Sequence, residues 1–530
     1  MDFDRRYPDI DGDPKKDIDA VVKFRRLRAN FPPSVLAEAK AAAKGLASPG
    51  KRLDLRRKFI FTCDPETAKD YDDALSIEKD SRGRRVLGVH IADVSHFVRP
   101  GSAMDKEALR RGNSVYFPGR VLPMLPEALS NSLCSLVPGE DRLAFSVFIV
   151  FDDAGNALKA SFAKSVINSK ARFEYDEVTA ALRGKPGRIP KRHLAALKEI
   201  NRLALQLRAR RFALGALDLE TPEYEIVLDE AGEMTGIAKR PYDESHIMIE
   251  ECMVAANEAV AAELWRRGVK IPARFHDAPD EEKLRILRAE LGGMGVRTGN
   301  IENRAVFSQF LASVKKHPLY QTIAMMVLRS MKRAVYDPAN MGHFGLAKRY
   351  YAHFTSPIRR YADLVLHREL ADFLAGSKPR IPMARLKSIC EHLNETEETA
   401  AEAERDVAEM KKYRYLMEPE RMRGAYDAVV SKCMPFGCFV DIPDIGVSGL
   451  VHISVLSDRY VRFNESDGTL SAPGGGSWRP GDRMEVVIGS VDAAHRKLDF
   501  IPVSERPKGA SSTSGGGRRA KNRKGGKKWN

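Results

Sequence analysis

The sequence predicts an α+β protein, in which a mixed β-sheet packed with helices is followed by a small all-β barrel and a disordered basic tail. Three observations predict this class. Apolar runs typical of buried strands alternate with turns from residue 51 to about 166. Helical patterns dominate from about 190 to 415, and short strands separated by Gly and Pro begin at about 420.

The order of these patterns divides the chain into four segments. We expect an N-terminal extension at 1–50, a large α/β-mixed domain at 51–418, a barrel at 419–505 and a tail at 506–530. In the extension, "DIDGDPKKDIDA" has the acidic character of a calcium-binding loop. It carries Pro14 at the sixth position instead of Gly, and Ala20 at the twelfth instead of Glu, which predicts a solvated acidic turn.

The large domain begins with strands and continues with helices. "RRVLGVHIADVSHFV" and "RLAFSVFIVFDDAG" predict buried strands, and the proline-rich "PGRVLPMLPEALSNSLCSLVPG" between them predicts a loop. "KRHLAALKEINRLALQLRARRFALG" predicts a helix that ends at Gly215, and two apolar helices follow it. The charged "EHLNETEETAAEAERDVAEMKKYRYLM" predicts a helix that leads out of the domain.

The charge of the chain favours a polyanionic partner. The net charge is +15 and the pI is about 9.4, which is typical of proteins that bind nucleic acid or an anionic membrane. Nine Lys or Arg and no acid lie from Arg506 onward, so the remainder carries +6. The Gly, Ser, Lys and Arg composition of the tail predicts disorder.

Cysteine usage and hydropathy predict a cytoplasmic protein. The six cysteines form no C-x-x-C pair or zinc spacing, so we expect free thiols in a reducing compartment. No apolar run reaches about 18 residues, and the polar N-terminus does not resemble a signal peptide. We expect no membrane partner.

Four aspartates lie within ten residues in "CDPETAKDYDDAL". Asp64, Asp70, Asp72 and Asp73 would repel one another, by about 4 kcal/mol for each pair at 4 Å and an effective dielectric of 20. A solvated turn is the simpler alternative, but the apolar segments "KFIFTC" and "ALSIEK" flank the cluster. Carboxylates suit Mg²⁺ and Mn²⁺, and a metal pair both removes the repulsion and supports phosphodiester cleavage. The cluster therefore predicts a magnesium-dependent nuclease.

Longer motifs resemble one enzyme family. "CDPETAKDYDDAL", "VHIADVSHFVRPGSAMDKEALRRGNSVYFPG", "IEECMVAANEAVA", "GHFGLA" and "YAHFTSPIRRYADLVLHREL" occur in the order found in the RNase II/RNase R (RNB) exoribonucleases. The resemblance covers about residues 20–505 and is strongest to the ribonuclease R branch. Members of that branch usually carry two cold-shock domains before the catalytic domain. The extension at 1–50 is too short for one, so we expect either a truncated or a naturally short member.

The resemblance implies roles for individual residues. The four aspartates become active-site carboxylates and metal ligands, with Asp72 as the residue whose loss abolishes chemistry but spares RNA binding. Roles outside the cluster are implied as follows: Arg359 in catalysis, Arg360 in a phosphate or structural contact, Tyr116 in stacking on a base, and Tyr175 with Glu250 or Glu251 near the terminal ribose. Leu219 in "GALDLE" departs from the family, which often has Phe there, and this puts the length of the final product in doubt.

The barrel sequence resembles an S1 RNA-binding domain, which has a five-stranded OB-fold. Phe436, Phe439 and His452 occupy positions where that family displays base-stacking side chains. The alternative for either phenylalanine is that it fills the barrel. Lys432 and Arg459 are weaker candidates for phosphate contacts.

Together these features predict a monomeric, hydrolytic, processive 3′→5′ exoribonuclease. The resemblance implies Mg²⁺ or Mn²⁺ as cofactor, two ions during catalysis, RNA 3′ ends as substrate, and nucleoside 5′-monophosphates with a short terminal oligonucleotide as products. No Walker motif occurs, so we expect no ATP requirement. Two alternatives stay open: a catalytically inactive RNA-binding or translational regulatory protein of the same fold, and a phosphorolytic exonuclease that releases diphosphates.

Overall fold

The computed structural model describes residues 13–44, 51–185, 187–219, 224–378, 381–465, 468–474, 476–493 and 495–503. The predicted disorder of the tail at 506–530 concerns residues outside this set. No helix among the described residues is long and apolar enough to cross a membrane.

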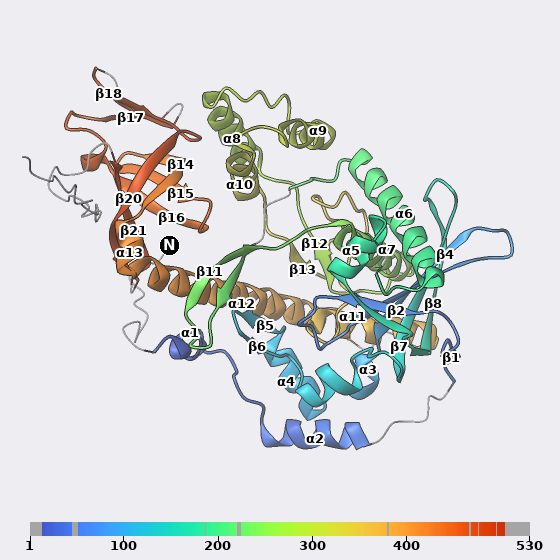
Figure 1. The fold of residues 1–530 in the computed structure, drawn as a ribbon. Helices are drawn as coiled ribbons and strands as arrows, with labels where there is room; N and C mark the ends of the chain where they lie inside the picture. Colours follow the sequence, from blue (N-terminus) through green and yellow to red (C-terminus); the bar gives the residue numbers. More distant parts are fainter. Residues whose placement is uncertain are drawn as a thin grey trace, which may run out of the picture.

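A seven-stranded mixed sheet forms the centre of the large domain (Figure 1). Its strands lie in the order β1-β8-β7-β4-β3-β2-β9, and only the pairs β1–β8 and β2–β9 are parallel. The strands are β1 (Leu53–Asp54), β2 (Phe61–Asp64), β3 (Asp73–Lys79), β4 (Arg85–Ala92), β7 (Asp141–Phe151), β8 (Ala157–Asn168) and β9 (Ala171–Glu174). The two strands predicted around the proline-rich segment are confirmed as β4 and β7.

Apolar cores cover both faces of this sheet. Successive residues of a strand point to opposite faces, so Leu75 joins the core against α5–α7, whereas Ala74 joins the core that includes α2, α4 and α12. The helices are α2 (Pro33–Lys44), α3 (Val94–Phe97), α4 (Ala103–Arg111), α5 (Tyr175–Leu182), α6 (Lys191–Ala213), α7 (Glu244–Arg266), α11 (Tyr361–Leu374) and α12 (Met383–Met417). Burial on both sides fixes the position of each strand end, where the candidate site lies.

Smaller elements surround this sandwich. The proline-rich segment contains no long helix, as predicted, but forms a hairpin and one π-helical turn at Ala128–Leu133. The strand pairs are β5 (Val115–Phe117) with β6 (Arg120–Leu122), β10 (Tyr224–Leu228) with β11 (Met234–Lys239), and β12 (Ala273–Phe275) with β13 (Val335–Asp337). Three helices with their own apolar cluster, α8 (Glu281–Gly293), α9 (Arg304–Val314) and α10 (Tyr320–Ser330), lie on the side towards the barrel (Figure 1).

The C-terminal domain is a closed five-stranded barrel, which confirms the predicted OB-type fold. Its order is β14-β15-β16-β21-β20, and a three-stranded sheet, β17-β18-β19, accompanies it. The strands are β14 (Ala425–Met434), β15 (Gly437–Ile442), β16 (Val447–His452), β17 (Arg462–Asn464), β18 (Thr469–Ala472), β19 (Gly476–Trp478), β20 (Arg483–Asp492) and β21 (Lys497–Pro502). The long α12 and the short α13 (Pro419–Arg423) connect it to the large domain (Figure 1).

The N-terminal segment packs on α12. Asp13 caps a 3₁₀ turn at Pro14–Lys16, and α1 (Asp17–Phe24) follows. Asp17 is buried and forms ion pairs with Lys411 at 3.0 Å and Arg414 at 2.8 Å. The prediction of a solvated acidic turn was therefore wrong for Asp17, because two cations of a distant helix neutralise it.

Candidate active site

The ends of two adjacent strands bring the aspartates together. Asp64 ends β2 and Asp73 begins β3, its antiparallel neighbour. Asp70 and Asp72 lie in the connection between them, and backbone hydrogen bonds hold this connection in place. The amide of Ala92 donates to the carbonyl of Asp72 at 2.9 Å, and the amide of Leu136 donates to the carbonyl of Tyr71 at 3.0 Å.

Burial makes this carboxylate cluster electrostatically unfavourable. Burial, followed by the charge of Asp73, raises the pKa of Asp64 to about 8. Burial raises the pKa of Asp73 to about 6 and holds that of Asp72 well above its ordinary value. The pKa of Asp70 is also raised, again mainly by burial. The charges of Arg359 and Arg172 oppose these rises in pKa but do not cancel them.

The donor set fits a hard divalent cation. Oδ2 of Asp64 is buried and has no hydrogen-bond partner among the described residues. Carboxylate oxygens without cysteine or histidine are the ligands that Mg²⁺ and Mn²⁺ prefer. In the described part of the chain, however, no three His, Cys, Asp or Glu side chains converge closely enough to hold one ion. The aspartates interact electrostatically, and their roles as metal ligands stay predictions.

Two cations act on this cluster, Arg172 near Asp64 and Arg359 near Asp72. Nε of Arg359 lies 3.9 Å from Oδ2 of Asp72, and the arginine side chain is 44% exposed. The amide of Ile358 donates to Oδ1 of Asp72 at 3.0 Å, which ties the arginine loop to the cluster. Arg360 instead donates to both carboxylate oxygens of Asp363 at 2.9 Å. Because Asp363 compensates the charge of Arg360, a structural contact is favoured over a phosphate contact for this residue.

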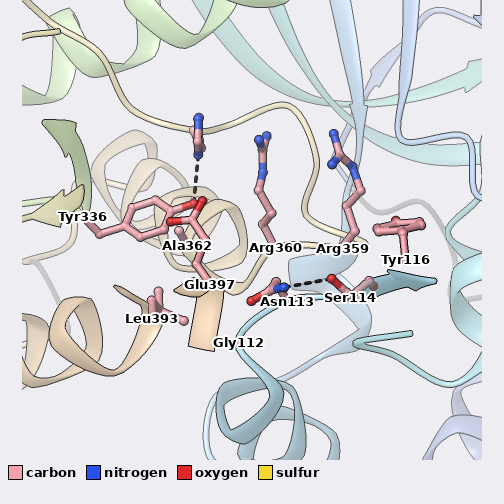
Figure 2. Close-up of a pocket in the computed structure, with 11 residues that line it drawn as sticks. Gly112, Asn113, Ser114, Tyr116, Tyr336, Arg359, Arg360, Ala362, Leu393 and Glu397 are labelled. Atoms are coloured by element: carbon pink, nitrogen blue, oxygen red, sulfur yellow. Dashed lines mark hydrogen bonds between the residues drawn. The ribbon is translucent and has the colours of Figure 1, made fainter. Parts of the chain in front are cut away.

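Tyr116 and both arginines line one pocket of about 200 Å³ (Figure 2). The tyrosine comes from β5, is 41% exposed, and lies beside Arg359. Its backbone amide donates to Oε1 of Glu404 at 2.6 Å, which anchors β5 on α12. The ring therefore does not pack in the core, and it is accessible for stacking.

Tyr175 lies near Asp73 and Asp64, whereas Tyr116 lies near Asp70 and Asp72. Tyr175 follows β9, in which Glu174 pairs in register with Asp64. Burial, followed by the charge of Asp73, raises its pKa, and Asp64 adds to this rise. The ring stacks on His246 with centroids 4.0 Å apart and an interplanar angle of 20°.

The two glutamates have different surroundings. Glu251 is 2% exposed and accepts hydrogen bonds from Arg211, from Nε at 3.1 Å. Glu250 is half-buried, 3.1 Å from the same arginine, and accepts a hydrogen bond from the hydroxyl of Tyr242. Because Glu251 is committed to a buried ion pair, Glu250 is the better candidate for contact with a terminal ribose.

Sequence reasoning missed three residues of this region. They are Arg211, Tyr242 and His246. Of the three, only His246 could have been found from the sequence, since it precedes Glu250 by four positions and so lies on the same face of the helix. The partners of Arg211 depend on the packing of α6 against α7, which no local pattern shows.

The remaining predicted contacts lie farther from the cluster. Leu219 packs on the apolar cluster of α8–α10. In the barrel, Phe436 and Phe439 are 44% and 37% exposed, with centroids 6.1 Å apart. The alternative that either ring fills the barrel was wrong. His452 is exposed on the neighbouring strand β16, where it pairs in register with Gly437.

Comparisons with known proteins agree with this architecture. The RNB domain family matches residues 52–376, and the S1 RNA binding domain family matches residues 425–501. Ribonuclease R of Thermotoga maritima is 38% identical over 514 residues, which cover 94% of this chain and 72% of that protein.

Solved structures give the same result. RNase R of Mycoplasma genitalium in complex with ribose methylated single-stranded RNA is 30% identical, with a TM-score of 0.87, covering 93% of this chain and 78% of that one. The same protein in complex with double-stranded RNA gives a TM-score of 0.81 at 29% identity, over 93% of this chain and 83% of that one. Yeast Ssd1, a pseudonuclease, is 21% identical with a TM-score of 0.70 over 90% of this chain and 59% of that one, a likeness of fold alone.

Proposed function

This chain belongs to the RNB family, and from that membership we propose that it is a hydrolytic, processive 3′→5′ exoribonuclease. Its products would be nucleoside 5′-monophosphates and a short terminal oligonucleotide. The observation that carries this proposal is the set of buried and half-buried carboxylates with the exposed Arg359 at 3.9 Å from Asp72. A loop with a purely structural role would not need four acids between the ends of two neighbouring strands.

Asp64, Asp70, Asp72 and Asp73 would hold divalent cations, and we propose two Mg²⁺ ions, with Mn²⁺ as a substitute. Ions at such a site supply an activated water and stabilise charge on the attacked phosphate. The hydrogen bond from the Ile358 amide orients the Asp72 carboxylate. The raised pKa values mean that cation binding and protonation compete for the same oxygens.

The chain's other residues would bind and orient RNA. Arg359 is placed to contact the scissile phosphate, since guanidinium groups bind phosphate bidentately and stabilise developing charge. Tyr116 offers an exposed ring for stacking on a base. Tyr175 and Glu250 would contact the terminal ribose, where a 2′-hydroxyl contact distinguishes RNA from DNA. Arg360 would support the loop through Asp363.

The barrel would hold RNA upstream of the site. Phe439 and His452 lie on adjoining strands and Phe436 lies in the turn before β15, all with exposed side chains, as base stacking requires. We propose that structured as well as single-stranded RNA is degraded, without ATP, because strand capture and hydrolysis supply the driving force. We propose a monomer acting in the cytoplasm, with domain boundaries at residues 51, 419 and 506.

An inactive RNA-binding role is the main competing function. The likeness in fold to a pseudonuclease shows that the fold alone does not imply catalysis. This chain retains all four aspartates and Arg359, which argues for an active enzyme.

One incubation separates these functions. A 5′-labelled RNA duplex with a 3′ single-stranded tail is incubated with Mg²⁺, with EDTA, and with the Asp72→Asn protein as control. We expect Mg²⁺-dependent release of nucleoside 5′-monophosphates and a short labelled remnant, with neither in the controls. Phosphate-dependent release of diphosphates would instead identify phosphorolysis, and RNA binding without any mononucleotide would refute the proposal.

A further inference from the structure

The pocket beside Arg359 has a wall to which the family motifs assign no role. Besides Tyr116 and the arginines, Asn113 and Tyr336 line it (Figure 2), and so does His353. Asn113 precedes β5, Tyr336 lies in β13, and His353 precedes the arginine loop. Three separate parts of the chain therefore meet beside the cation that is placed to hold the phosphate.

This wall is rigid. The hydroxyl of Tyr336 and Nδ1 of His353 are hydrogen-bonded at 2.9 Å. The Tyr336 backbone amide donates to the side chain of Asn394 at 2.7 Å, and its carbonyl accepts from the same side chain at 3.0 Å. The guanidinium of Arg274 lies 4.9 Å from the centroid of the Tyr336 ring. A ligand would meet a preformed surface, which lowers the entropy lost on binding.

Most charges around the pocket are compensated internally. Arg360 is paired with Asp363, and Glu397 accepts two hydrogen bonds from Arg274 at 2.7 and 2.9 Å. The pKa of His353 lies well below its ordinary value, because of burial and of the nearby arginines, so its imidazole is neutral. These residues leave Arg359 as the cation at one end of an otherwise neutral, polar and aromatic wall.

Two polar atoms of the wall are available for a ligand. Among the described residues, neither Nε2 of His353 nor Oδ1 of Asn113 has a hydrogen-bond partner. A neutral imidazole nitrogen donates or accepts according to its tautomer, and an amide oxygen accepts. Such a pair can meet the polar edge of any of the four bases.

We propose that this pocket is a nucleobase subsite, which receives the base of one nucleotide of bound RNA while Arg359 contacts that nucleotide's phosphate. The base edge contacts His353 and Asn113, and Tyr336 orients the imidazole. The subsite accepts any of the four bases. Each time the RNA advances by one nucleotide, the next base makes the same contact. This inference rests on the proposed function for the identity of the ligand.

The test couples one side chain to one nucleotide. In the Asp72→Asn full-length protein with Mg²⁺, affinity is measured for 5′-fluorescent single-stranded RNAs in which one abasic ribose is moved stepwise from the 3′ end. We expect the loss of base at one position to weaken binding about three- to tenfold through these hydrogen bonds. The same measurement is made on the double variant that also carries His353→Phe, which keeps a ring but no nitrogen. In this variant, removing the base at that position should no longer weaken binding, and the effects at the other positions should be unchanged.

Two further variants control the interpretation. Tyr336→Phe removes the hydroxyl that orients His353, and it should reduce the same penalty. Tyr413→Phe removes another buried tyrosine hydroxyl, on α12, whose hydrogen bond goes to the Arg496 carbonyl at 3.3 Å, and it should leave the profile unchanged. An unchanged abasic profile in His353→Phe, or an equal change at every position, would overturn the subsite.

If the His353→Phe variant does not fold, Tyr336→Phe and Asn113→Ala are tested in its place. Each must reduce the abasic penalty at the same single position. Hydrolysis of unmodified RNA by the parent protein is measured in parallel. Activity without position-specific coupling refutes the subsite alone. Absence of hydrolysis refutes the proposed function, whatever the abasic profile shows.

Discussion

Metal removal is expected to make the stability of this protein fall as the pH rises from about 4 to about 8. Burial and Asp73 raise the pKa of Asp64 to about 8, and burial raises that of Asp73 to about 6. An aspartate in an unfolded chain titrates near 3.9. Between these values the folded protein holds protons that the unfolded chain has released, so the free energy of unfolding decreases with rising pH.

The size of this effect follows from the pKa values. A rise from 3.8 to about 6, as for Asp73, corresponds to about 3 kcal/mol of lost stability once the group is ionised. Asp64 adds a contribution of the same sign over a wider pH range. A loss of about 3 kcal/mol lowers the melting temperature of a domain larger than 150 residues by on the order of 5–10 °C.

Thermal unfolding with and without Mg²⁺ measures this effect. The protein is melted in EDTA and in Mg²⁺ at about pH 5.5 and about pH 8, where a ligand specific for the folded state raises the melting temperature. Mg²⁺ should stabilise the protein more at the higher pH, because protons no longer compete. Asp64→Asn removes a charge that burial and the neighbouring Asp73 disfavour, so this variant should be more stable than the parent in EDTA at the higher pH, and should gain less from Mg²⁺.

A surface aspartate provides the matched control. Asp54 is exposed, and hydrogen bonds from Arg56 lower its pKa, so Asp54→Asn should not stabilise the protein at either pH. The reasoning is refuted if metal-free Asp64→Asn is no more stable than the parent at about pH 8. It is also refuted if the gain from Mg²⁺ is the same at both values of pH.

Four further predictions concern RNA. Asp72→Asn should lower the rate of hydrolysis at least about a hundredfold with RNA affinity retained, as single-turnover kinetics and filter binding would show; near-normal turnover contradicts the metal assignment. Tyr116→Ala should lengthen the smallest product on a sequencing gel, because a stacked base contributes about 1–3 kcal/mol, whereas Tyr116→Phe should not; identical end products in both would exclude a clamp. His246→Phe keeps a ring against Tyr175 and should retain the preference for a 3′-terminal ribose over a deoxyribose. His246→Asn has no ring and should lose this preference. An equal preference in both variants would refute a stacking role for His246. Deleting residues 506–530 should flatten the dependence of log affinity on log salt, since each phosphate contact adds about 0.7 to the slope on single strands; an unchanged slope means that the tail does not contact RNA.

The features that could be predicted are those encoded locally. Apolar runs bounded by turns specified β4 and β7, which are buried on both faces, whereas alternating residues with Gly and Pro turns specified the strands of the barrel. The aspartate cluster spans ten residues at two adjacent strand ends, so its approximate geometry follows from one strand connection. Arg359 is distant in sequence, and only the family resemblance linked it to the cluster.

The features that could not be predicted depend on partners far away in the chain. The residues around Asp17 in the sequence resemble those of a solvated turn, yet Asp17 is buried and forms ion pairs with Lys411 and Arg414. Glu250 and Glu251 are adjacent residues of the same type, and the sequence does not distinguish them. Only the packing of α6 on α7 places Glu251 in a buried ion pair with Arg211 and Glu250 at the edge of it. Charge pairing of this kind is set by tertiary structure, where the identity of a residue does not specify its neighbour.

The unfavourable electrostatics of the aspartate cluster also distinguish catalysis from RNA binding alone. A binding protein needs cations and exposed rings, and this chain supplies these with Arg359, Phe436 and Phe439. Buried, mutually repelling carboxylates weaken both the fold and the attraction for a polyanion. A bound cation would offset both effects at the place where Arg359 meets Asp72. The crowding of four carboxylates, with pKa values raised by burial, therefore favours the proposed metal-dependent phosphodiesterase over a protein that only binds RNA.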